Sequence, residues 1–252
     1  MFSRCVIIPI YDNEQTIRGV VESVVALDLP CLIVDDGSHA ATRQVLREID
    51  RDFSRVEVIR RESNGGKGAA MARGFHAAFD RGYTHAIQLD ADGQHRAEDG
   101  PRLLDEARRS PGALILGRPV FDDDAPGIRR YGRWVTHFWV WLETLSFDIK
   151  DALCGFRCYP LEPVVRLYEN VEIGHGMVFD TEIAVRLYWD GVPMVNVDTS
   201  VSYVRGGVSH FHYVRDNLRI MRLHTVLVFG MLRRLPSLLF RTRSGITATG
   251  QP

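Results

Sequence analysis

Several features that mark specialised classes of protein are missing from this sequence. Its 252 residues include only four cysteines, too few for a disulfide framework. It has no uninterrupted run of about 18 apolar residues, so no segment is expected to span a bilayer. The first apolar run, residues 5–10, is too short for a signal peptide. We therefore expect a cytoplasmic protein with reduced cysteines.

An excess of charge of either sign is also missing. The chain has 31 basic and 32 acidic residues, a formal net charge of −1, so no overall field would attract nucleic acid, and we expect no such partner. Any binding of phosphate must come from local groups. The composition, 45% hydrophobic and 25% charged, is typical of a globular protein, and we expect a single domain.

Apolar runs alternate with helical patterns along the first half of the chain. Strands are predicted at residues 5–10, 31–34, 56–59 and 85–89, and helices at residues 14–27, 42–52 and 68–81. This alternation predicts an α/β fold with a mainly parallel sheet and flanking helices. The strands are followed by the polar clusters YDN, DDGS, SNGGKG and DADGQH. Ligands bind at the carboxyl ends of such strands, so these loops are expected to form one site.

The pattern changes after residue 116. We expect a loop at residues 117–127, an aromatic helix at 129–145, a compact segment at 151–160, a helix near 180–189 and a strand near 194–197. Residues 213–240 mix arginine with apolar residues, and the polar tail after them is expected to be flexible. The expected domain is 1–225, with a nucleotide-binding half (1–117) and an acceptor-side half (118–225), followed by an amphipathic stretch and tail (226–252).

Two carboxylates directly follow the fourth predicted strand. Asp90 and Asp92 form an Asp-x-Asp pair that points oxygen ligands at one hard cation, and Mg²⁺ or Mn²⁺ is the expected ion. Gln94 or His95 could complete the ligand set or touch a sugar. A divalent ion there would bridge a diphosphate and stabilise charge on a departing nucleotide. An ordinary acidic turn after a strand is the alternative explanation.

Two other loops could hold parts of a nucleotide. A carboxylate in the segment from Asp35 to Ser38 could accept a hydrogen bond from a base or a ribose, although a helix cap with a turn has the same pattern. The glycine-rich loop around Lys67 opens a helix and would let backbone N–H groups approach an anion. It lacks the spacing of a P-loop, and Lys67 could equally be a solvated loop residue.

Taken together, the ordered motifs resemble those of family 2 glycosyltransferases with a GT-A fold, particularly the dolichyl-phosphate mannose synthase-like branch. The resemblance covers roughly residues 5–225 and rests on VIIPIYDNEQTI, LIVDDGS, NGGKGAAMARGF, LDADGQH, LGRP, DALCGFRCYP, FDTEI and YVRGGVSHF. The series in this order is more specific than any one motif. It implies an inverting transferase that moves a sugar from a nucleotide diphosphate, a UDP- or GDP-sugar, by single displacement.

The resemblance also implies roles for individual residues. With the glycine-rich loop included, the candidates for nucleotide-sugar binding are Pro9, Tyr11, Val34, Asp36, Lys67, Asp90, Ala91, Arg118, Arg205 and His210. The metal ligands are expected to be Asp90, Asp92 and Gln94. Two positions depart from the family pattern, because His210 stands where lysine is usual and Tyr-Asn-Glu becomes the run from Tyr11 to Asn13.

The acceptor decides whether a general base is needed. A hydroxyl acceptor requires a base within hydrogen-bond reach, and the candidates are Asp151, Asp180 and Glu182. A lipid phosphate is already an anion and needs no base, in which case these acids would organise the site. A capping or salt-bridging role explains them equally well, because FDTEI also reads as the first turn of a helix.

The acceptor side and a membrane surface are expected in the second half of the chain. Gly155 and Arg157, in a segment that the resemblance places beneath the acceptor, and Arg133 are the candidate residues, with a purely structural turn as the alternative. Arginines at residues 129–133 precede four aromatic residues at 134–141, a combination that suits lipid headgroups but also a hydrophobic core. We expect a lipid-linked or amphipathic acceptor and a peripheral location at the cytoplasmic face of a membrane.

Two other functions fit parts of the pattern. A nucleotidyltransferase also uses paired carboxylates and a metal at the edge of an α/β sheet, but it releases pyrophosphate, whereas sugar transfer releases a nucleoside diphosphate. A non-catalytic nucleotide-sugar binding protein would bind donor and metal without turnover. The Asp90 and Asp92 pair favours the transferase.

Overall fold

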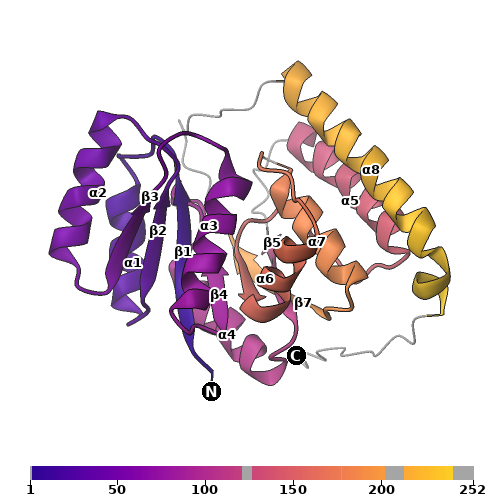
Figure 1. Ribbon diagram of the computed structural model, residues 1–252, viewed down its shortest axis with the longest axis horizontal. Helices are drawn as coiled ribbons and strands as arrows, with labels where there is room; N and C mark the ends of the chain where they lie inside the picture. Colours follow the sequence, from indigo (N-terminus) through magenta and orange to yellow (C-terminus); the bar gives the residue numbers. More distant parts are fainter. Residues whose placement is uncertain (1, 121–126, 177, 202–212, 241–252) are drawn as a thin grey trace.

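A computed structural model describes residues 2–120, 127–176, 178–201 and 213–240. Its strands are β1 (Arg4–Ile10), β2 (Cys31–Asp35), β3 (Val56–Arg60), β4 (His85–Gln88), β5 (Leu114–Val120), β6 (Arg157–Pro160) and β7 (Met194–Ser200) (Figure 1). They form a seven-stranded sheet in the order β3-β2-β1-β4-β6-β5-β7. Only β6 runs against its neighbours, antiparallel to both β4 and β5. The predicted α/β fold with a mainly parallel sheet is confirmed.

Helices cover both faces of the sheet (Figure 1). One face packs against α1 (Ile17–Ala26), α2 (Ala40–Asp52) and α4 (Gly100–Arg109), which follows the short helix η1 (Ala97–Asp99). The other face packs against α3 (Lys67–Asp80), α5 (Gly127–Thr144), α6 (Leu161–Asn170), α7 (Phe179–Trp189) and α8 (Tyr213–Leu239). Successive strand residues point to opposite faces, so Ile7 and Ile8 of β1 enter different cores. All four cysteines are buried, and none of them forms a disulfide.

Two strands differ from the prediction in the second half of the chain. A loop is predicted from Gly117, but β5 continues to Val120. Because β6 pairs with β5 only at Ile115 and Leu116, Pro119 lies where β7 alone is paired with β5, and a strand tolerates proline there. The compact segment at 151–160 supplies β6, whose residues are all buried and so show no alternating pattern.

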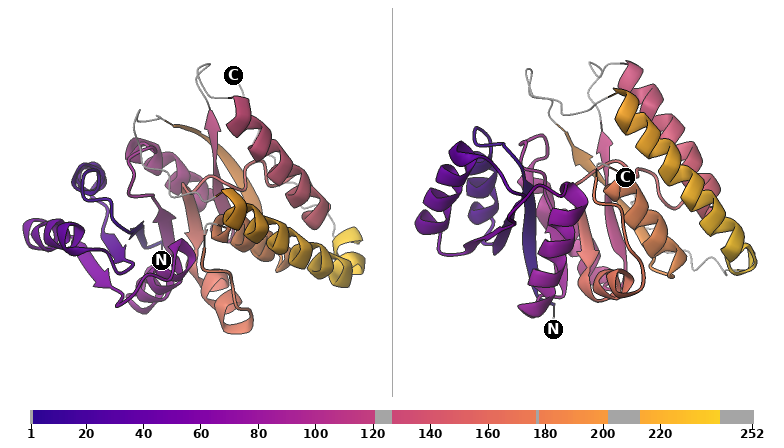
Figure 2. Two further views of the ribbon diagram at one scale, coloured as in Figure 1. Left: turned by 90° about the horizontal axis from the view of Figure 1, so that it is seen from above. Right: turned by 45° about the horizontal axis from the view of Figure 1, so that its top comes forward.

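The C-terminal helix crosses the expected boundary at residues 225 and 226. α8 runs without interruption from Tyr213 to Leu239 and contains Pro236 near its end. It lies beside α5, and the two helices form one side of the molecule, away from β3 (Figure 2). Within the described residues, every helix falls short of the length and apolar character needed to cross a membrane.

Candidate active site

A half-buried lysine joins two acids from different parts of the chain. α3 begins at Lys67, whose ammonium lies 2.8 Å from Asp90 Oδ1 and 2.8 Å from Asp180 Oδ2. Asp90 follows β4 and Asp180 stands in the first turn of α7, so three elements meet at one cation. Burial disfavours the charged lysine, but the two carboxylates outweigh it and raise the pKa of Lys67. The ammonium therefore stays charged and compensates both acids.

Asp180 is fixed by two residues that the sequence reasoning missed. Gln88 Nε2 donates to Asp180 Oδ1 at 2.8 Å, and the Tyr159 hydroxyl donates to Gln88 Oε1 at 3.0 Å. The two side chains come from the paired strands β4 and β6. A glutamine within an otherwise apolar, buried strand was the available signal, because a buried amide needs hydrogen-bond partners. This chain of contacts keeps the Asp180 carboxylate facing Lys67.

Asp92 completes the acidic pair after β4. Its carboxylate accepts the backbone N–H of Gln94 at 3.0 Å. Burial, with the neighbouring charge of Asp90, raises the pKa of Asp92. Burial alone would also raise the pKa of Asp90, but the ammonium of Lys67 holds it below its usual value. The pair therefore places two neighbouring carboxylates beside Lys67, whose charge is shared with Asp180.

The acidic pair fits a divalent cation. Asp90 Oδ1 is buried, and although the Lys67 ammonium lies close, this oxygen receives no hydrogen bond of regular geometry. Oxygen atoms of carboxylates and amides are the ligands that Mg²⁺ and Mn²⁺ prefer, and Asp90, Asp92 and Gln94 supply them. Across the described residues, no three His, Cys, Asp or Glu side chains gather around one point. A metal here would thus take its other ligands from water or a diphosphate.

The segment before β6 packs closely against this centre. A Cβ on Gly155 would lie 2.5 Å from Asp90 Oδ2 and 2.8 Å from Lys67 Nζ, so a side chain would displace both groups. Arg157 has no exposed surface, and its guanidinium donates to the carbonyl oxygens of Ala152, Cys154 and Asp180 at 2.5–2.8 Å. Arg157 therefore shapes this segment from inside, and its role on the acceptor side stays a prediction.

Asp36 holds the glycine-rich loop. Its carboxylate accepts the N–H of Gly66 at 2.6 Å and that of Gly65 at 3.1 and 3.2 Å, and it pairs with Arg61. Asp36 is buried, with 2% exposure, and its contact with a base or ribose stays a prediction. Gly66 has a φ of 89°, and a Cβ there would lie 2.5 Å from the His175 carbonyl oxygen, so only glycine fits.

The remaining candidates at the ends of β1 and β2 differ in exposure. Tyr11 is half-buried, with its ring centroid 6.1 Å from that of His39. Pro9 and Val34 are buried partners in the register of the two strands. Val34 has no exposed surface and packs towards Gly74 of α3, so its side chain belongs to the core rather than to the wall of a pocket.

The other predicted contacts of the donor are Arg118, Arg205, His210 and Ala91. Arg118 on β5 forms a bidentate ion pair with Asp198 on β7, in which Nε lies 2.5 Å from Oδ1 and Nη2 lies 2.7 Å from Oδ2. Arg205 and His210 lie outside the described residues. Ala91 is buried, and its carbonyl oxygen accepts the Thr16 hydroxyl at 2.6 Å.

Asp151 is engaged by several donors at once. Arg133 Nε donates to it at 2.6 Å, and the backbone N–H groups of Leu153 and Cys154 donate at 2.9 and 2.8 Å. Burial would raise its pKa, but His137 and Arg133 hold the pKa of Asp151 well below its usual range. A carboxylate stabilised as an anion in this way is a poor proton acceptor.

The other two candidate bases are engaged as well. Glu182 accepts the N–H of Gly174 at 2.8 Å and forms an ion pair with Arg186 at 2.7 Å. Asp180 accepts from Lys67 and Gln88. All three acids predicted as bases are therefore buried and have partners of their own.

Comparison with solved structures shows the fold of this chain. TarS of S. aureus in complex with UDP-GlcNAc superposes with a TM-score of 0.62 at 16% identity, covering 94% of this chain and 72% of that one. The mannosyltransferase PcManGT from Pyrobaculum calidifontis, in complex with GDP-Man and Mn²⁺, gives 0.60 at 15% identity, covering 92% and 64%. The fold is the GT-A fold.

The family follows from sequence. The family described as Glycosyl transferase family 2 matches residues 5–163, so the chain belongs to it and is a glycosyltransferase, as the resemblance implied. It is 29% identical to the polyprenol monophosphomannose synthase of Mycolicibacterium smegmatis over 221 residues, 81% of this chain and 79% of the relative. It is 26% identical to the undecaprenyl-phosphate mannosyltransferase of Micrococcus luteus over 204 residues, 76% and 80%.

Proposed function

We propose that this glycosyltransferase transfers a sugar from a nucleotide diphosphate to a polyprenyl phosphate, with inversion at the anomeric carbon. The names of the two relatives, which each refer to a polyprenyl phosphate or phosphomannose product, support this acceptor. The observation that carries the proposal is that each of the three acids that could act as a base is already paired with a cation of the protein.

Asp151, Asp180 and Glu182 are each paired with a lysine or arginine side chain. An alcohol acceptor would need one of them to take its proton during the displacement. A phosphate acceptor needs no such step, because a phosphate oxygen is already negatively charged and can attack directly. The acids then serve to orient Lys67, Arg133 and Arg186.

On the donor side, the proposed ligands of Mg²⁺ or Mn²⁺ are Asp90 and Asp92, with Gln94 beside them. A bound ion would neutralise charge on the diphosphate as the sugar departs. Lys67 keeps Asp90 ionised at neutral pH and adds a positive charge at the same edge of the sheet. Tyr11 and the backbone around Ala91 would line the donor, and Arg118, Arg205 and His210 are the proposed contacts of its diphosphate.

The surface formed by α5 and α8 supports a peripheral location at a membrane. On α5, Trp134 is 58% and Phe138 49% exposed, and on α8, Met221 is 65% and Phe229 61% exposed. Arginines such as Arg233 stand among them on α8. Exposed aromatic and aliphatic side chains beside arginines suit the interface of an anionic bilayer. Flotation with anionic liposomes at low salt tests this, and a protein that stays in the dense fraction would contradict it.

The reaction itself is tested by product analysis. With Mn²⁺ and a panel of GDP- and UDP-sugars, we expect transfer to a polyprenyl phosphate, release of a nucleoside diphosphate, and no transfer to the matching polyprenol. Release of pyrophosphate would instead indicate a nucleotidyltransferase, and donor binding without any product would indicate a sugar-binding protein. Transfer to the polyprenol but not to its phosphate would contradict the proposed acceptor.

A further inference from the structure

The lysine at the active centre has two acids as partners but a single positive charge. Lys67 Nζ lies 2.8 Å from Asp90 Oδ1 and 2.8 Å from Asp180 Oδ2. In the proposed function Asp90 is also a ligand of a divalent cation, and two cations on one carboxylate repel each other. Asp90 can bind a divalent cation fully only if the Lys67 ammonium shifts towards Asp180. The residues that fix Asp180 therefore affect how well Asp90 binds a metal.

The Asp180 carboxylate is anchored from inside the sheet. Gln88 Nε2 donates to Asp180 Oδ1 at 2.8 Å, which leaves Oδ2 directed at Lys67. The backbone carbonyl oxygen of Asp180 accepts from Arg157 Nη1 at 2.5 Å, so the first turn of α7 is held as well. Gln88 and Arg157 have no exposed surface, so solvent cannot replace these hydrogen bonds.

Tyr159 fixes the direction of the Gln88 amide. The Tyr159 hydroxyl donates to Gln88 Oε1 at 3.0 Å. Because an amide has an acceptor oxygen on one side and a donor nitrogen on the other, this bond turns the N–H group of Gln88 towards Asp180. Tyr159 also has no exposed surface, and its ring packs edge-on against Phe75 of α3 with the centroids 4.8 Å apart. The orientation of the amide is thus set by the core.

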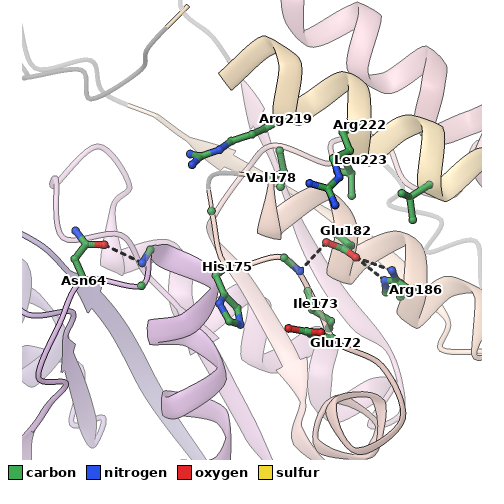
Figure 3. A pocket seen from close by; sticks show the side chains of 15 residues that line it. Asn64, Glu172, Ile173, His175, Val178, Glu182, Arg186, Arg219, Arg222 and Leu223 are labelled. Carbon is green, nitrogen blue, oxygen red and sulfur yellow. Dashed lines mark hydrogen bonds and ion pairs between the residues drawn. The ribbon is translucent and has the colours of Figure 1, made fainter. Parts of the chain in front are cut away.

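The two helices that carry the lysine and its second acid are also joined through the loop before α7. The N–H of Gly68, in the first turn of α3, donates to the carbonyl oxygen of His175 at 2.8 Å. The N–H of Gly174 in the same loop donates to Glu182 of α7 at 2.8 Å, and Glu182 also pairs with Arg186 in the wall of the adjoining cavity (Figure 3). These contacts hold the start of α3 against α7, so the ammonium can shift between the two acids by side-chain movement alone.

We propose that Gln88 and Tyr159 are positioning residues for metal binding: they keep Asp180 ready to hold the Lys67 ammonium, which leaves Asp90 available to a divalent cation. This role rests on the proposed function, in which Asp90 is a metal ligand. Without the N–H of Gln88, Asp180 Oδ1 is buried with no donor, and the carboxylate turns to find another. Oδ2 then leaves the ammonium, and Lys67 stays on Asp90 and competes with the metal.

Binding of Mn²⁺ alone, followed through the electron paramagnetic resonance signal of the free ion, tests this role without donor, acceptor or turnover. We expect Gln88→Leu to weaken Mn²⁺ binding about tenfold, the scale of one hydrogen bond to a charged group. Tyr159→Phe should weaken it about threefold, because the amide keeps its N–H group but loses its fixed direction. The matched control is Tyr168→Phe, a tyrosine that packs on the same Phe75 and whose hydroxyl forms no hydrogen bond with any group that the structure describes. Its Mn²⁺ affinity should equal that of the unaltered protein.

A double variant separates this role from a general loss of packing. In Lys67→Met no ammonium competes for Asp90, so adding Gln88→Leu should leave the Mn²⁺ affinity within about twofold of Lys67→Met alone. A loss as large as in the protein that keeps Lys67 would overturn the proposed role, and so would an equal or higher affinity of Gln88→Leu than of the unaltered protein. Both results leave the metal site itself intact. Mn²⁺ binding that is unaffected by Asp90→Asn would instead contradict the metal site of the proposed function, together with the role of Gln88.

Discussion

The active centre and the surface of α5 and α8 differ in which side chains are exposed to solvent. At the centre, Lys67, Asp90 and Asp180 are shielded from solvent, and each charge has a partner within the protein. On the α5 and α8 surface, Trp134, Met221 and other large apolar side chains are exposed to solvent. The first region holds charge in a fixed arrangement before any ligand arrives, whereas the second gains stability only when another apolar phase covers it.

The difference indicates how the proposed donor and the proposed acceptor would each obtain their binding energy. The proposed donor, a nucleotide diphosphate, is highly charged, and the centre would meet it with charges that are already held in place. The proposed acceptor, a polyprenyl phosphate, is mostly apolar, and an exposed apolar surface next to arginines would meet both of its parts. Each of the following variants alters one region and should leave the other unchanged.

The largest effect is expected from the acidic pair. Asp90→Asn should lower the rate of sugar transfer about 10³-fold, because the metal and the diphosphate lose a charged ligand. The control, Asp105→Asn on the surface of α4, should retain full activity. A quantitative assay of released nucleoside diphosphate decides between them, and normal turnover by Asp90→Asn would remove Asp90 from the mechanism.

Removing the cation of the centre should mainly cost stability. In Lys67→Met, Asp90 and Asp180 lose their shared partner, and we expect the free energy of unfolding to fall by about 4 kcal/mol. Mn²⁺ should restore part of this loss, since a divalent ion can replace the ammonium beside Asp90. Urea unfolding with and without Mn²⁺ measures both effects. An unchanged midpoint in Lys67→Met, as expected for the exposed Lys150→Met, would show that the bridge contributes nothing.

Asp151 links stability to pH. Its pKa is lowered in the folded protein, so its stabilising contribution is complete above the usual carboxyl pKa of about 4 and is lost as the pH falls below that value. We expect Asp151→Asn to destabilise the protein by about 2 kcal/mol at pH 7. This difference should shrink steadily when urea unfolding is repeated from pH 4 downwards. A difference independent of pH, like that expected for the exposed Asp190→Asn, would contradict the ion pair with Arg133.

The smallest effect concerns the α8 surface. Phe229→Ser should weaken partitioning onto anionic vesicles about fivefold, because it removes part of one aromatic side chain from the apolar contact. Phe79→Ser on α3, which removes a phenylalanine that is 42% exposed on another part of the molecule, should have no effect on partitioning. Turnover with a soluble short-chain acceptor should be the same in both variants. Equal loss of vesicle binding in the two variants would mean that this surface is not the membrane contact.

The sequence predicted the parts of the molecule that depend on local pattern. Strands β1 to β4 and the collection of their loops at one edge follow from apolar runs that end in polar residues. β6 could not be predicted in the same way, because its place between β4 and β5 is set by packing and not by its four residues.

The candidate site shows the same limit. Asp36, Lys67 and Asp180 were identified as polar residues in the right loops, but their partners lie from 23 to 113 residues away in the chain. Which donor meets which carboxylate depends on the three-dimensional approach of these loops. Arg157 is the clearest case, since nothing in its neighbours indicates that its guanidinium binds backbone carbonyls inside the core.

The central claim is that Asp90 and Asp92 hold a divalent cation against the diphosphate of the donor. The most direct measurement is the affinity of GDP and UDP, determined calorimetrically with Mn²⁺ and with EDTA. We predict that Mn²⁺ strengthens binding of one of the two nucleotides at least tenfold and that the gain disappears in Asp90→Asn and Asp92→Asn. Equal affinity with and without Mn²⁺ in the unaltered protein, or an undiminished gain in both variants, would contradict the account.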